Sequence, residues 1–542
     1  MTADRASIRA DVFVIGGGLA GLRAAAAARR AGRDVVIASR GRAGAGGCSV
    51  RASGGFAAAT DPADTPRDHC MDTLSGGYGI GERELVRRMT EEAPARLGEL
   101  AAEVDGFARH DGRLQGAPAP VHGFPRSVQY LPGMPRLLAC LRDQLERAGV
   151  RVLDRQRCVR LDREAGSRVR GLWLFDERTL ALRYGSAGAV VLAGGGCGRL
   201  YPVTSNGPDA TGDAFALALD AGCALRDMEF IQFTPTAFAA PASVRGRTIV
   251  GTLLTLSGVV LTNSKGERFM GRYDPDRMER ADRATLARAV AEEVLAGRGS
   301  PNGGVFLDVR SVPSAELDRH RPGFHGFCQE AGLDPATELL ETAPSAHTCL
   351  GGVAVDGEMR ACEGLYAAGE AAGGVHGANR LSSNSLIDAL VGGWRAGKSA
   401  AASCVKPVPE PAGEAPPVPA RGQWDPAGLL ADLRRVMGDR AGVVRSGEGL
   451  SVGLREVAEI GKSMQSLAGR GVTDPGKWLD LLGLIATAEG ILTASLMREE
   501  SRGAHCRRDF PTPGEDAWIG SIHLTRHGGK LSARFLSIDH AI

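Results

Sequence analysis

The sequence predicts an α/β fold built on a doubly wound, mostly parallel β-sheet. The apolar run at residues 11–15 predicts a short buried strand, the Ala-rich stretch at 19–30 a helix, and residues 34–39 a second strand. A strand, a tight turn, a helix and another strand form the first unit of such a sheet. Residues 189–193 and 364–368 are further apolar strands that run into glycines. Parts of one sheet are therefore expected far apart in the chain.

The length of 542 residues predicts two to four domains, each of roughly 100 to 200 residues. We expect a discontinuous nucleotide-binding domain with an inserted α+β capping domain and a C-terminal helical domain. A stretch rich in Pro, Ala and Glu predicts a linker before the last of these. The expected boundaries are 1–227 with 342–404 for the nucleotide-binding domain, 228–341 for the cap, 405–421 for the linker and 422–542 for the helical domain.

The composition excludes several classes of function. Lys and Arg total 65 against 63 for Asp and Glu, so no charge excess indicates a nucleic acid or a membrane surface as a partner. The 11 cysteines include no C-x-x-C pair, which argues against a zinc site or an iron–sulfur cluster. We find no signal-peptide pattern and no apolar run near the roughly 18 residues of a membrane span. A soluble cytoplasmic protein without a bound metal is expected.

A glycine-rich turn connects the first predicted strand to the first predicted helix. It satisfies G-x-G-x-x-G, the arrangement that brings backbone N–H groups and a helix N-terminus against a pyrophosphate. The acidic residue that usually meets the adenosine ribose after the second strand is replaced by Ser39-Arg40, which argues against NAD. The turn consists of Gly16, Gly17, Gly18, Leu19, Ala20 and Gly21.

Several segments together resemble one family of flavoproteins. They are residues 47–55, 193–201, 204–206, 211–213, 364–370 and 498–505. The sequence is similar over most of its length to the FAD-dependent oxidoreductase family that contains the flavoprotein subunits of fumarate reductase and succinate dehydrogenase, and L-aspartate oxidase. This resemblance implies that the nucleotide-binding domain is a Rossmann-type domain that binds FAD.

The resemblance also implies which residues hold FAD. In the family a Ser-Lys pair ends the second strand, as Ser39-Arg40 does here. Cys48 stands nearest the position where the respiratory enzymes carry a His bonded covalently to the flavin, so we expect FAD to be bound without a covalent link. The remaining residues implied at the cofactor are Ser49, Ala52, Ser53, Gly54, Gly55, Asp213, Glu370, Ser385 and Leu386.

Two further segments resemble the substrate-binding motifs of the family. His347 lies in Ser-Ala-His-Thr-Cys-Leu-Gly-Gly-Val and Arg380 in His-Gly-Ala-Asn-Arg-Leu-Ser-Ser-Asn-Ser-Leu. The resemblance implies that both bind a carboxylate of the substrate. A planar guanidinium with two parallel donors suits this role, because it fixes both oxygens and so orients the neighbouring C–H toward flavin N5.

The predicted cap departs from the family pattern. Thr234 stands where relatives have a His, and without gaps Thr252 and Thr255 take the places of a Glu and an Arg that serve the reacting carbon. Arg283 lies in a segment that resembles the family's next Arg-bearing helix, and we expect it to take part in proton transfer. A second ionised carboxylate buried in this pocket would lack a compensating positive charge, and this would cost several kcal/mol. Arg245 or Arg247 could replace the lost Arg.

We therefore expect an FAD-dependent oxidase or dehydrogenase that removes two electrons from a small carboxylate-bearing or amino-acid-derived substrate, at a C–C or C–N bond, and not from succinate. Hydride would pass to flavin N5 and on to oxygen or another acceptor. No iron–sulfur partner is expected to be required. The alternatives are L-aspartate oxidase of NAD synthesis, the flavoprotein subunit of a fumarate reductase or succinate dehydrogenase type of complex, and a non-enzymatic member that binds FAD only.

Overall fold

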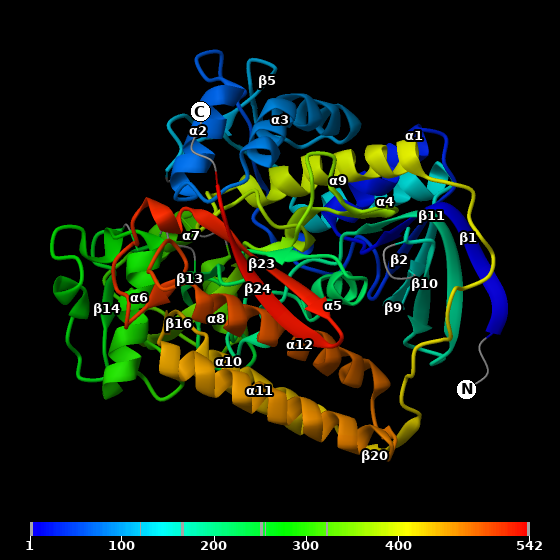
Figure 1. Ribbon diagram of the computed structural model, residues 1–542. Coiled ribbons are helices and arrows are strands. Elements are labelled where there is room, and N and C mark those ends of the chain that lie inside the picture. Colours follow the sequence, from blue (N-terminus) through cyan, green and yellow to red (C-terminus); the bar gives the residue numbers. More distant parts are fainter. Residues whose placement is uncertain are drawn as a thin grey trace.

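The computed structural model describes residues 4–119, 121–163, 167–249, 253–254, 256–320 and 323–538. Figure 1 shows a central sheet with helices on both sides, a separate lobe formed by the middle of the chain, and a row of long helices from the C-terminal part. The predicted positions Thr252 and Thr255 lie outside the described residues.

The central sheet confirms the predicted doubly wound α/β fold. Its strand order is β18-β19-β11-β1-β2-β8, with β10 added antiparallel to β11 and β9 antiparallel to β10. The pairs β19 with β11, β11 with β1, β1 with β2, and β2 with β8 are all parallel. The strands are β1 (Asp4–Ile15), β2 (Val35–Ser39), β8 (Arg151–Asp154), β9 (Gln156–Asp162), β10 (Gly171–Asp176), β11 (Leu182–Leu192), β18 (Arg360–Cys362) and β19 (Leu365–Ala367).

Both faces of this sheet are buried, as the continuous apolar strands predict. Side chains alternate along a strand, so Val12 and Val14 of β1 join one core cluster while Phe13 and Ile15 join another. The first face is covered by α1 (Leu19–Arg30), α3 (Arg83–Glu103), α4 (Met134–Arg147) and α9 (Asn384–Ser403). The second is covered by α5 (Asp213–Asp220) and the C-terminal helices.

Helix α1 has the bounds predicted from the sequence, and it packs unusually close to α9. A Cβ at Gly393 would lie 2.3 Å from the carbonyl oxygen of Ala20, and one at Gly397 would lie 2.1 Å from that of Ala24. Only glycine permits this backbone approach. The contact holds the N-terminal ends of both helices against the same cavity, which is described below.

The middle of the chain forms an α+β cap. Its antiparallel sheet has the order β13-β16-β15-β14, with β13 (Ile231–Phe238), β14 (Val260–Thr262), β15 (Val305–Asp308) and β16 (Leu340–Cys349). The helices are α6 (Arg283–Glu293), α7 (Ser314–His320) and α8 (Phe324–Glu330). The cap sheet extends past the expected boundary at residue 341, because the β13–β16 ladder continues to the pair Ile231 and Cys349.

The C-terminal part is helical only as far as Met497. Helices α10 (Ala427–Arg440), α11 (Gly447–Ala468) and α12 (Pro475–Met497) are followed by a hairpin of β23 (Gly520–His527) and β24 (Lys530–Ser537). Strand β23 pairs with β12 (Leu225–Arg226), so the chain end returns to the nucleotide-binding domain. This hairpin differs from the helical domain predicted over residues 422–542, and its own signal is local, since the Gly528-Gly529 turn joins its two strands.

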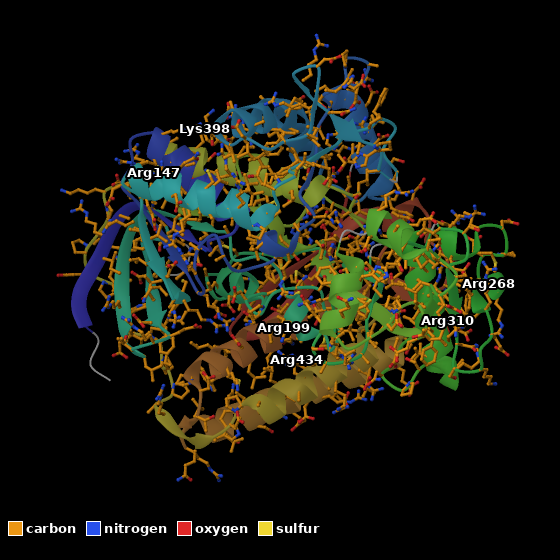
Figure 2. All side chains as sticks on the ribbon, turned by 180° about the vertical axis from the view of Figure 1, so that it is seen from behind. Arg147, Arg199, Arg268, Arg310, Lys398 and Arg434 are labelled. Carbon is orange, nitrogen blue, oxygen red and sulfur yellow. The ribbon has the colours of Figure 1, made fainter. Side chains whose placement is uncertain are left out.

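A hydrogen bond from α10 and the buried apolar side chains of α12 attach the C-terminal helices to the rest of the molecule. Figure 2 shows Arg199 and Arg434 next to each other, and Nε of Arg434 on α10 donates a hydrogen bond to the Arg199 carbonyl at 3.0 Å. Helix α12 is the one described helix long and apolar enough to cross a membrane, but 67% of its apolar window is buried in the protein. Its apolar side chains therefore belong to the core.

The family-like segment at residues 498–505 forms a buried cluster of ion pairs. Arg498 pairs with Glu229 at 2.7 Å and with Glu500 at 2.9 Å, and Arg502 pairs with Glu500 at 2.8 Å. Arg498, Glu229 and Glu500 are inaccessible to solvent, and a buried charge without its partner is strongly destabilising. The segment thus connects the C-terminal part to the start of the cap and does not reach the cavity.

Candidate active site

One large cavity of about 920 Å³ lies where the nucleotide-binding domain meets the cap. It opens at the carboxyl ends of the parallel strands, where ligands of doubly wound sheets bind. All predicted cofactor and substrate residues within the described chain line it except Gly21 and Gly54. These two glycines lie behind the residues that line the cavity. A Cβ at Gly21 would lie 2.0 Å from the Gly16 carbonyl oxygen, and Gly54 has a φ of +89° beside Tyr130.

The glycine-rich turn forms one end of the cavity and fits a pyrophosphate. Gly16 has a φ of +115°, and a Cβ there would lie 2.2 Å from the Ala193 carbonyl oxygen. Helix α1 starts at Gly18 without a side-chain cap of its own, and its Leu19 N–H donates to Ser49 Oγ at 3.2 Å. Backbone N–H groups at a helix start bind phosphate oxygens. The turn therefore leaves room and donors for the phosphates of FAD.

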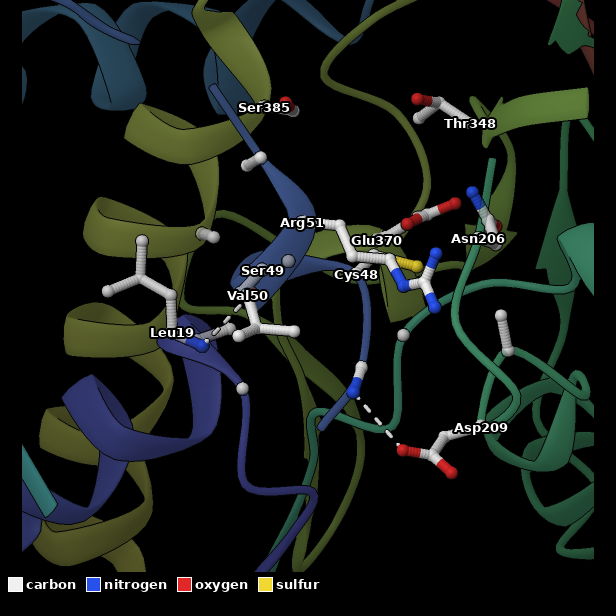
Figure 3. Close-up of a pocket in the computed structure, with 18 of the residues that line it drawn as sticks. Leu19, Cys48, Ser49, Val50, Arg51, Asn206, Asp209, Thr348, Glu370 and Ser385 are labelled. Atoms are coloured by element: carbon white, nitrogen blue, oxygen red, sulfur yellow. Dashed lines mark hydrogen bonds between the residues drawn. The ribbon is translucent and has the colours of Figure 1, made fainter. Parts of the chain in front are cut away.

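The segment that follows β2 crosses in front of this turn (Figure 3). Cys48, Ser49, Val50 and Arg51 lie between the start of α1 and the loop that carries Asp209. The Asp209 carboxylate accepts a hydrogen bond from the Gly47 N–H at 3.1 Å, and this contact fixes the segment along the cavity wall. Sequence reasoning did not identify Asp209, which lies in none of the family-like segments.

Arg40 and Asp213 line the cavity but are held by partners from distant parts of the chain. Arg40 pairs with Asp480 at 2.8 Å and with Glu177 at 3.2 Å. The Asp213 carboxylate pairs with Arg157 at 2.6 Å. Because Asp480 lies on α12, these ion pairs also join the C-terminal helices to the cofactor end of the cavity.

The carboxyl group of Glu370 lines the cavity, and its side chain is half-buried. Its Oε1 accepts a hydrogen bond from the Cys349 N–H at 3.0 Å. Burial raises the pKa of Glu370 to about 7, although that hydrogen bond and the positive charge of Arg380 favour the ionised form. The carboxyl is thus able to donate or accept a hydrogen bond near neutral pH, as expected for a partner of sugar or ribityl hydroxyls.

The raised pKa of Glu370 predicts a pH-dependent stability of the flavin-free protein. In the unfolded chain the carboxyl ionises near 4.5 and in the folded protein near 7, so the folded state binds more protons between these values. The resulting stabilisation is complete below pH 4.5 and is lost as the pH rises through 7, about 3 kcal/mol in all. Urea unfolding at several pH values should show this slope in the flavin-free protein.

Glu370→Gln should remove that part of the slope, and the matched change Glu363→Gln at an exposed carboxylate should leave it in place. An unchanged slope in Glu370→Gln would contradict the assignment of the titration to this carboxyl.

Three basic side chains meet at the other end of the cavity. Arg380 follows the nucleotide-binding domain's last sheet strand, His347 lies on β16, and Arg283 is the first residue of α6 in the cap. None of the three forms an ion pair with any residue that the structure describes. Burial, Arg380 and Arg283 together lower the pKa of His347 to about 3, so its imidazole is neutral. Burial and Arg283 lower the pKa of Arg380 to about 9, which leaves it charged at neutral pH.

Arg283 is exposed to the cavity, and the protein around it lowers its pKa by desolvation. Two positive charges that repel each other inside one cavity, with a neutral imidazole beside them, form a site for an anion. The geometry brings together the predicted pair His347 and Arg380, and it adds the predicted Arg283 to the same site.

We call His347, Arg380 and Arg283 together the clamp. Hydrogen bonds to neighbouring side chains orient two of them, Arg380 and His347. Gln232 on β13 accepts from Arg380 Nε at 3.1 Å and donates to the Arg380 carbonyl at 3.1 Å. Ser205 Oγ and His347 Nδ1 are 2.8 Å apart, which leaves the other ring nitrogen of His347 available to a ligand. Ser205 lies in a segment that resembles the family, and Gln232 lies two residues before Thr234, but nothing in the sequence alone indicates that they support Arg380 and His347.

Apart from Arg283, the cap side of the cavity carries little free charge among the described residues. Thr234 lines it, and its hydroxyl donates to the Thr236 carbonyl at 3.4 Å. Arg247 also lines it, but it pairs with Glu330 at 2.9 Å and stacks over the Phe327 ring at 5.1 Å. Arg245 and Arg247 were the two candidates to replace the Arg that the family carries at the reacting carbon. Arg247 lines the cavity and Arg245 does not.

Comparison with known proteins agrees with this site. The model of the FAD binding domain matches residues 11–386, and that of the fumarate reductase flavoprotein C-terminus matches residues 430–538. The chain is 36% identical to a subunit of the fumarate reductase (CoM/CoB) from Methanothermobacter marburgensis, over 97% of this chain and 98% of the relative. It is also 36% identical to an L-aspartate oxidase from Caulobacter vibrioides, over 94% and 95%.

Among solved structures, the chain is similar to Mycobacterium smegmatis Sdh1 in complex with UQ1, with a TM-score of 0.87, 32% identity, and coverage of 98% of this chain and 95% of that one. The long matches in sequence and structure, together with the glycine turn and the basic clamp, show that the chain belongs to the FAD-dependent oxidoreductase family of fumarate reductase flavoproteins and L-aspartate oxidases.

Proposed function

We propose that the protein oxidises a small carboxylate-bearing or amino-acid-derived molecule by two electrons, through C–C or C–N desaturation. The observation that supports this most is the group of His347, Arg380 and Arg283, which faces the cofactor cavity without an acidic partner among the described residues. An anionic substrate supplies the missing negative charge. When bound, FAD supplies the acceptor for the hydride at its N5.

The protein's own residues would act as follows. Arg380 donates to both oxygens of the substrate carboxylate and so sets the orientation of the neighbouring C–H. The neutral His347 adds a hydrogen bond to the same carboxylate. Arg283, whose pKa is lowered because the surrounding protein desolvates it, exchanges the proton at the reacting carbon.

The cap residues Thr234 and Arg247, which also line the cavity, support a substrate other than succinate. A second carboxylate there would meet the Thr234 hydroxyl and an Arg247 already paired with Glu330. Burying a charge without a free counter-charge is unfavourable, so the distal end of the substrate is neutral or zwitterionic.

An anaerobic substrate screen tests this proposal. The purified yellow protein is mixed with monocarboxylates, dicarboxylates, amino acids and cyclic analogues, and bleaching of the flavin band is followed. We expect bleaching by at least one monocarboxylate or amino acid and none by succinate. Bleaching by succinate alone, or by no member of the panel, would refute the proposed substrate class.

L-Aspartate oxidase is the second candidate. Its support is the 36% identity with the Caulobacter vibrioides enzyme of that name and the Arg247–Glu330 pair, whose carboxylate is a partner for a substrate ammonium group. Aerobic formation of hydrogen peroxide from L-aspartate would favour this candidate, and no peroxide from L-aspartate would exclude it.

A third candidate is the flavoprotein subunit of a larger complex, supported by the relative whose name describes it as one subunit of a fumarate reductase. We propose instead that the protein works without an iron–sulfur partner. Purification of the tagged protein from its own cells decides between these two. A cluster-bearing chain that copurifies and is needed for turnover would support the complex, and full turnover by the isolated chain would support independence.

We also propose that FAD is held without a covalent bond. Burial and the nearby Glu370 raise the pKa of Cys48 to about 12, so its thiol stays protonated and is a poor nucleophile. Acid denaturation should therefore release all the yellow colour into the supernatant, and Cys48→Ser should keep its FAD. Colour that remains on the polypeptide, and is lost from it in Cys48→Ser, would show a cysteinyl link.

A further inference from the structure

A carboxylate that the proposed reaction does not use lines the cofactor cavity from helix α9. It belongs to Asp388, and the imidazole of His376 lines the cavity beside it. The two side chains are buried, with 5% and 7% of their surface exposed. Nε2 of His376 and Oδ2 of Asp388 are 3.4 Å apart, and no other residue that the structure describes forms an ion pair with Asp388.

The Asp388 carboxylate receives no hydrogen bond from the described part of the chain. Its two oxygens are nevertheless not sealed inside the protein, in contrast to Nδ1 of His376, which is sealed and has no partner. Because the residue as a whole is buried, the accessible surface of these oxygens opens into the cavity that Asp388 lines. A carboxylate in such a place is costly unless donors reach it, so a ligand in the cavity is expected to supply them.

Asp388 lies close to the end of the cavity that fits the pyrophosphate. A Cβ at Gly392 would lie 3.5 Å from Oδ1 of Asp388 and 3.8 Å from the backbone nitrogen of Gly369. Gly369 in turn packs against the first turn of α1, where a Cβ on it would lie 2.9 Å from the Ala20 side chain. The carboxylate is thus near the start of α1, where backbone N–H groups are free for phosphate oxygens.

On its other side Asp388 is connected to the clamp. Its partner His376 stands four residues before Arg380, in the segment His-Gly-Ala-Asn-Arg. If hydride leaves a substrate held by the clamp, FAD spans the cavity from the glycine turn to Arg380. The part of FAD between its pyrophosphate and its flavin ring is the ribityl chain, whose hydroxyl groups are hydrogen-bond donors. This placement rests on the proposed function.

We propose that Asp388 binds the cofactor by accepting hydrogen bonds from the ribityl hydroxyls of FAD, and that His376 is its positioning residue. The contact of 3.4 Å with Nε2 orients the carboxylate and leaves its oxygens open to the hydroxyls. A hydrogen bond to an ionised carboxylate is stronger than one to a neutral acceptor. Asp388 therefore selects a flavin with a hydroxylated chain, from a different segment of the chain than Glu370 does.

The test is an exchange of flavins in the purified holoenzyme. The protein is incubated with equal amounts of FAD and an FAD analogue in which an unsubstituted pentyl chain replaces the ribityl chain, and the bound flavins are then released and quantified. The wild type should prefer FAD. Asp388→Leu, which has no acceptor, should reduce this preference by roughly tenfold or more, and Asp388→Asn, which keeps a neutral acceptor, should reduce it less.

The ratio of the two flavins separates a contact from a general structural role. A defect in folding lowers the affinity for both flavins alike and leaves the preference unchanged. An unchanged preference in Asp388→Leu and Asp388→Asn would therefore overturn the proposal, even if both variants held less flavin. Because the exchange needs no substrate, its result is also independent of the substrate screen that tests the proposed function.

Variants of His376 test the positioning role. His376→Gln retains an N–H donor for the carboxylate and should keep most of the preference for FAD, whereas His376→Leu loses the donor and should lower the preference toward that of Asp388→Leu. Asp432→Asn, at an exposed carboxylate of α10 that does not line the cavity, is the matched control and should behave as the wild type. Equal preferences in His376→Leu and the wild type would overturn the role of His376.

Discussion

Arg380→Ala is expected to raise the activation free energy for the proposed carboxylate substrate by about 3 kcal/mol or more, which lowers kcat/KM by roughly two orders of magnitude, while FAD stays bound. Arg380 is buried, charged, and held by Gln232 and by the Leu381 carbonyl, neither of which neutralises it. Its positive charge is not neutralised by these partners and is therefore available to an anionic substrate. No other described side chain takes the position of Arg380. Steady-state kinetics together with the flavin absorbance of the purified variant measure both parts of this result.

Two further variants sharpen the test of Arg380. Arg380→Lys keeps the charge but lacks the planar pair of donors, so it should recover only part of the loss. Arg245→Ala removes an exposed cap arginine that does not line the cavity and should leave kcat/KM unchanged. Full activity in Arg380→Ala would contradict the carboxylate clamp, as would equal losses in Arg380→Ala and Arg245→Ala.

Gly21→Ala is expected to abolish FAD binding. The added methyl carbon would lie 2.0 Å from the Gly16 carbonyl oxygen, and that oxygen belongs to backbone that cannot move without shifting the whole glycine turn. The start of α1 would then be displaced from the phosphates, and the helix from β1. The variant should purify colourless, and added FAD should not restore the flavin spectrum at concentrations that saturate the wild type.

The matched control is Gly98→Ala on α3, where an added methyl group meets no atom within 4 Å. This variant should bind FAD normally and be slightly more stable, by about 1 kcal/mol, because alanine favours a helix more than glycine does. A yellow Gly21→Ala protein with normal affinity would show that the close packing of turn and helix is not needed for the cofactor.

The first part of the fold could be predicted from the sequence because its signals are local. The apolar strand, the glycine turn and the Ala-rich helix lie next to one another, and α1 has the bounds expected for it, Leu19–Arg30. The hairpin at the chain end was missed although its signal is local, because β23 pairs with β24 across the Gly528-Gly529 turn. Only the pairing of β23 with β12 depends on the whole chain folding back. The end of the cap sheet could not be predicted, because the pairing of β13 with β16 decides it.

The candidate site also contains residues that could be predicted from the sequence and residues that could not. His347, Arg380 and Glu370 are recognisable because each lies within a family-like motif. Gln232 and Arg380 are 148 residues apart, and their hydrogen bond follows from the position of the cap against the sheet. Phe327 and Glu330 lie on α8, which carries no motif, so their place at the cavity is evident only in three dimensions.

The clamp draws its charges from separately folded layers of the molecule, and this has an energetic consequence. Arg283 belongs to α6 of the cap and Arg380 to the nucleotide-binding domain, and the two guanidinium groups oppose each other's charge. With the cavity empty, this repulsion acts against the approach of the cap. A bound carboxylate turns the same pair into an attractive bridge across the domain boundary. The negative charge of a substrate of the proposed class would thus strengthen the attachment of the cap over the cavity.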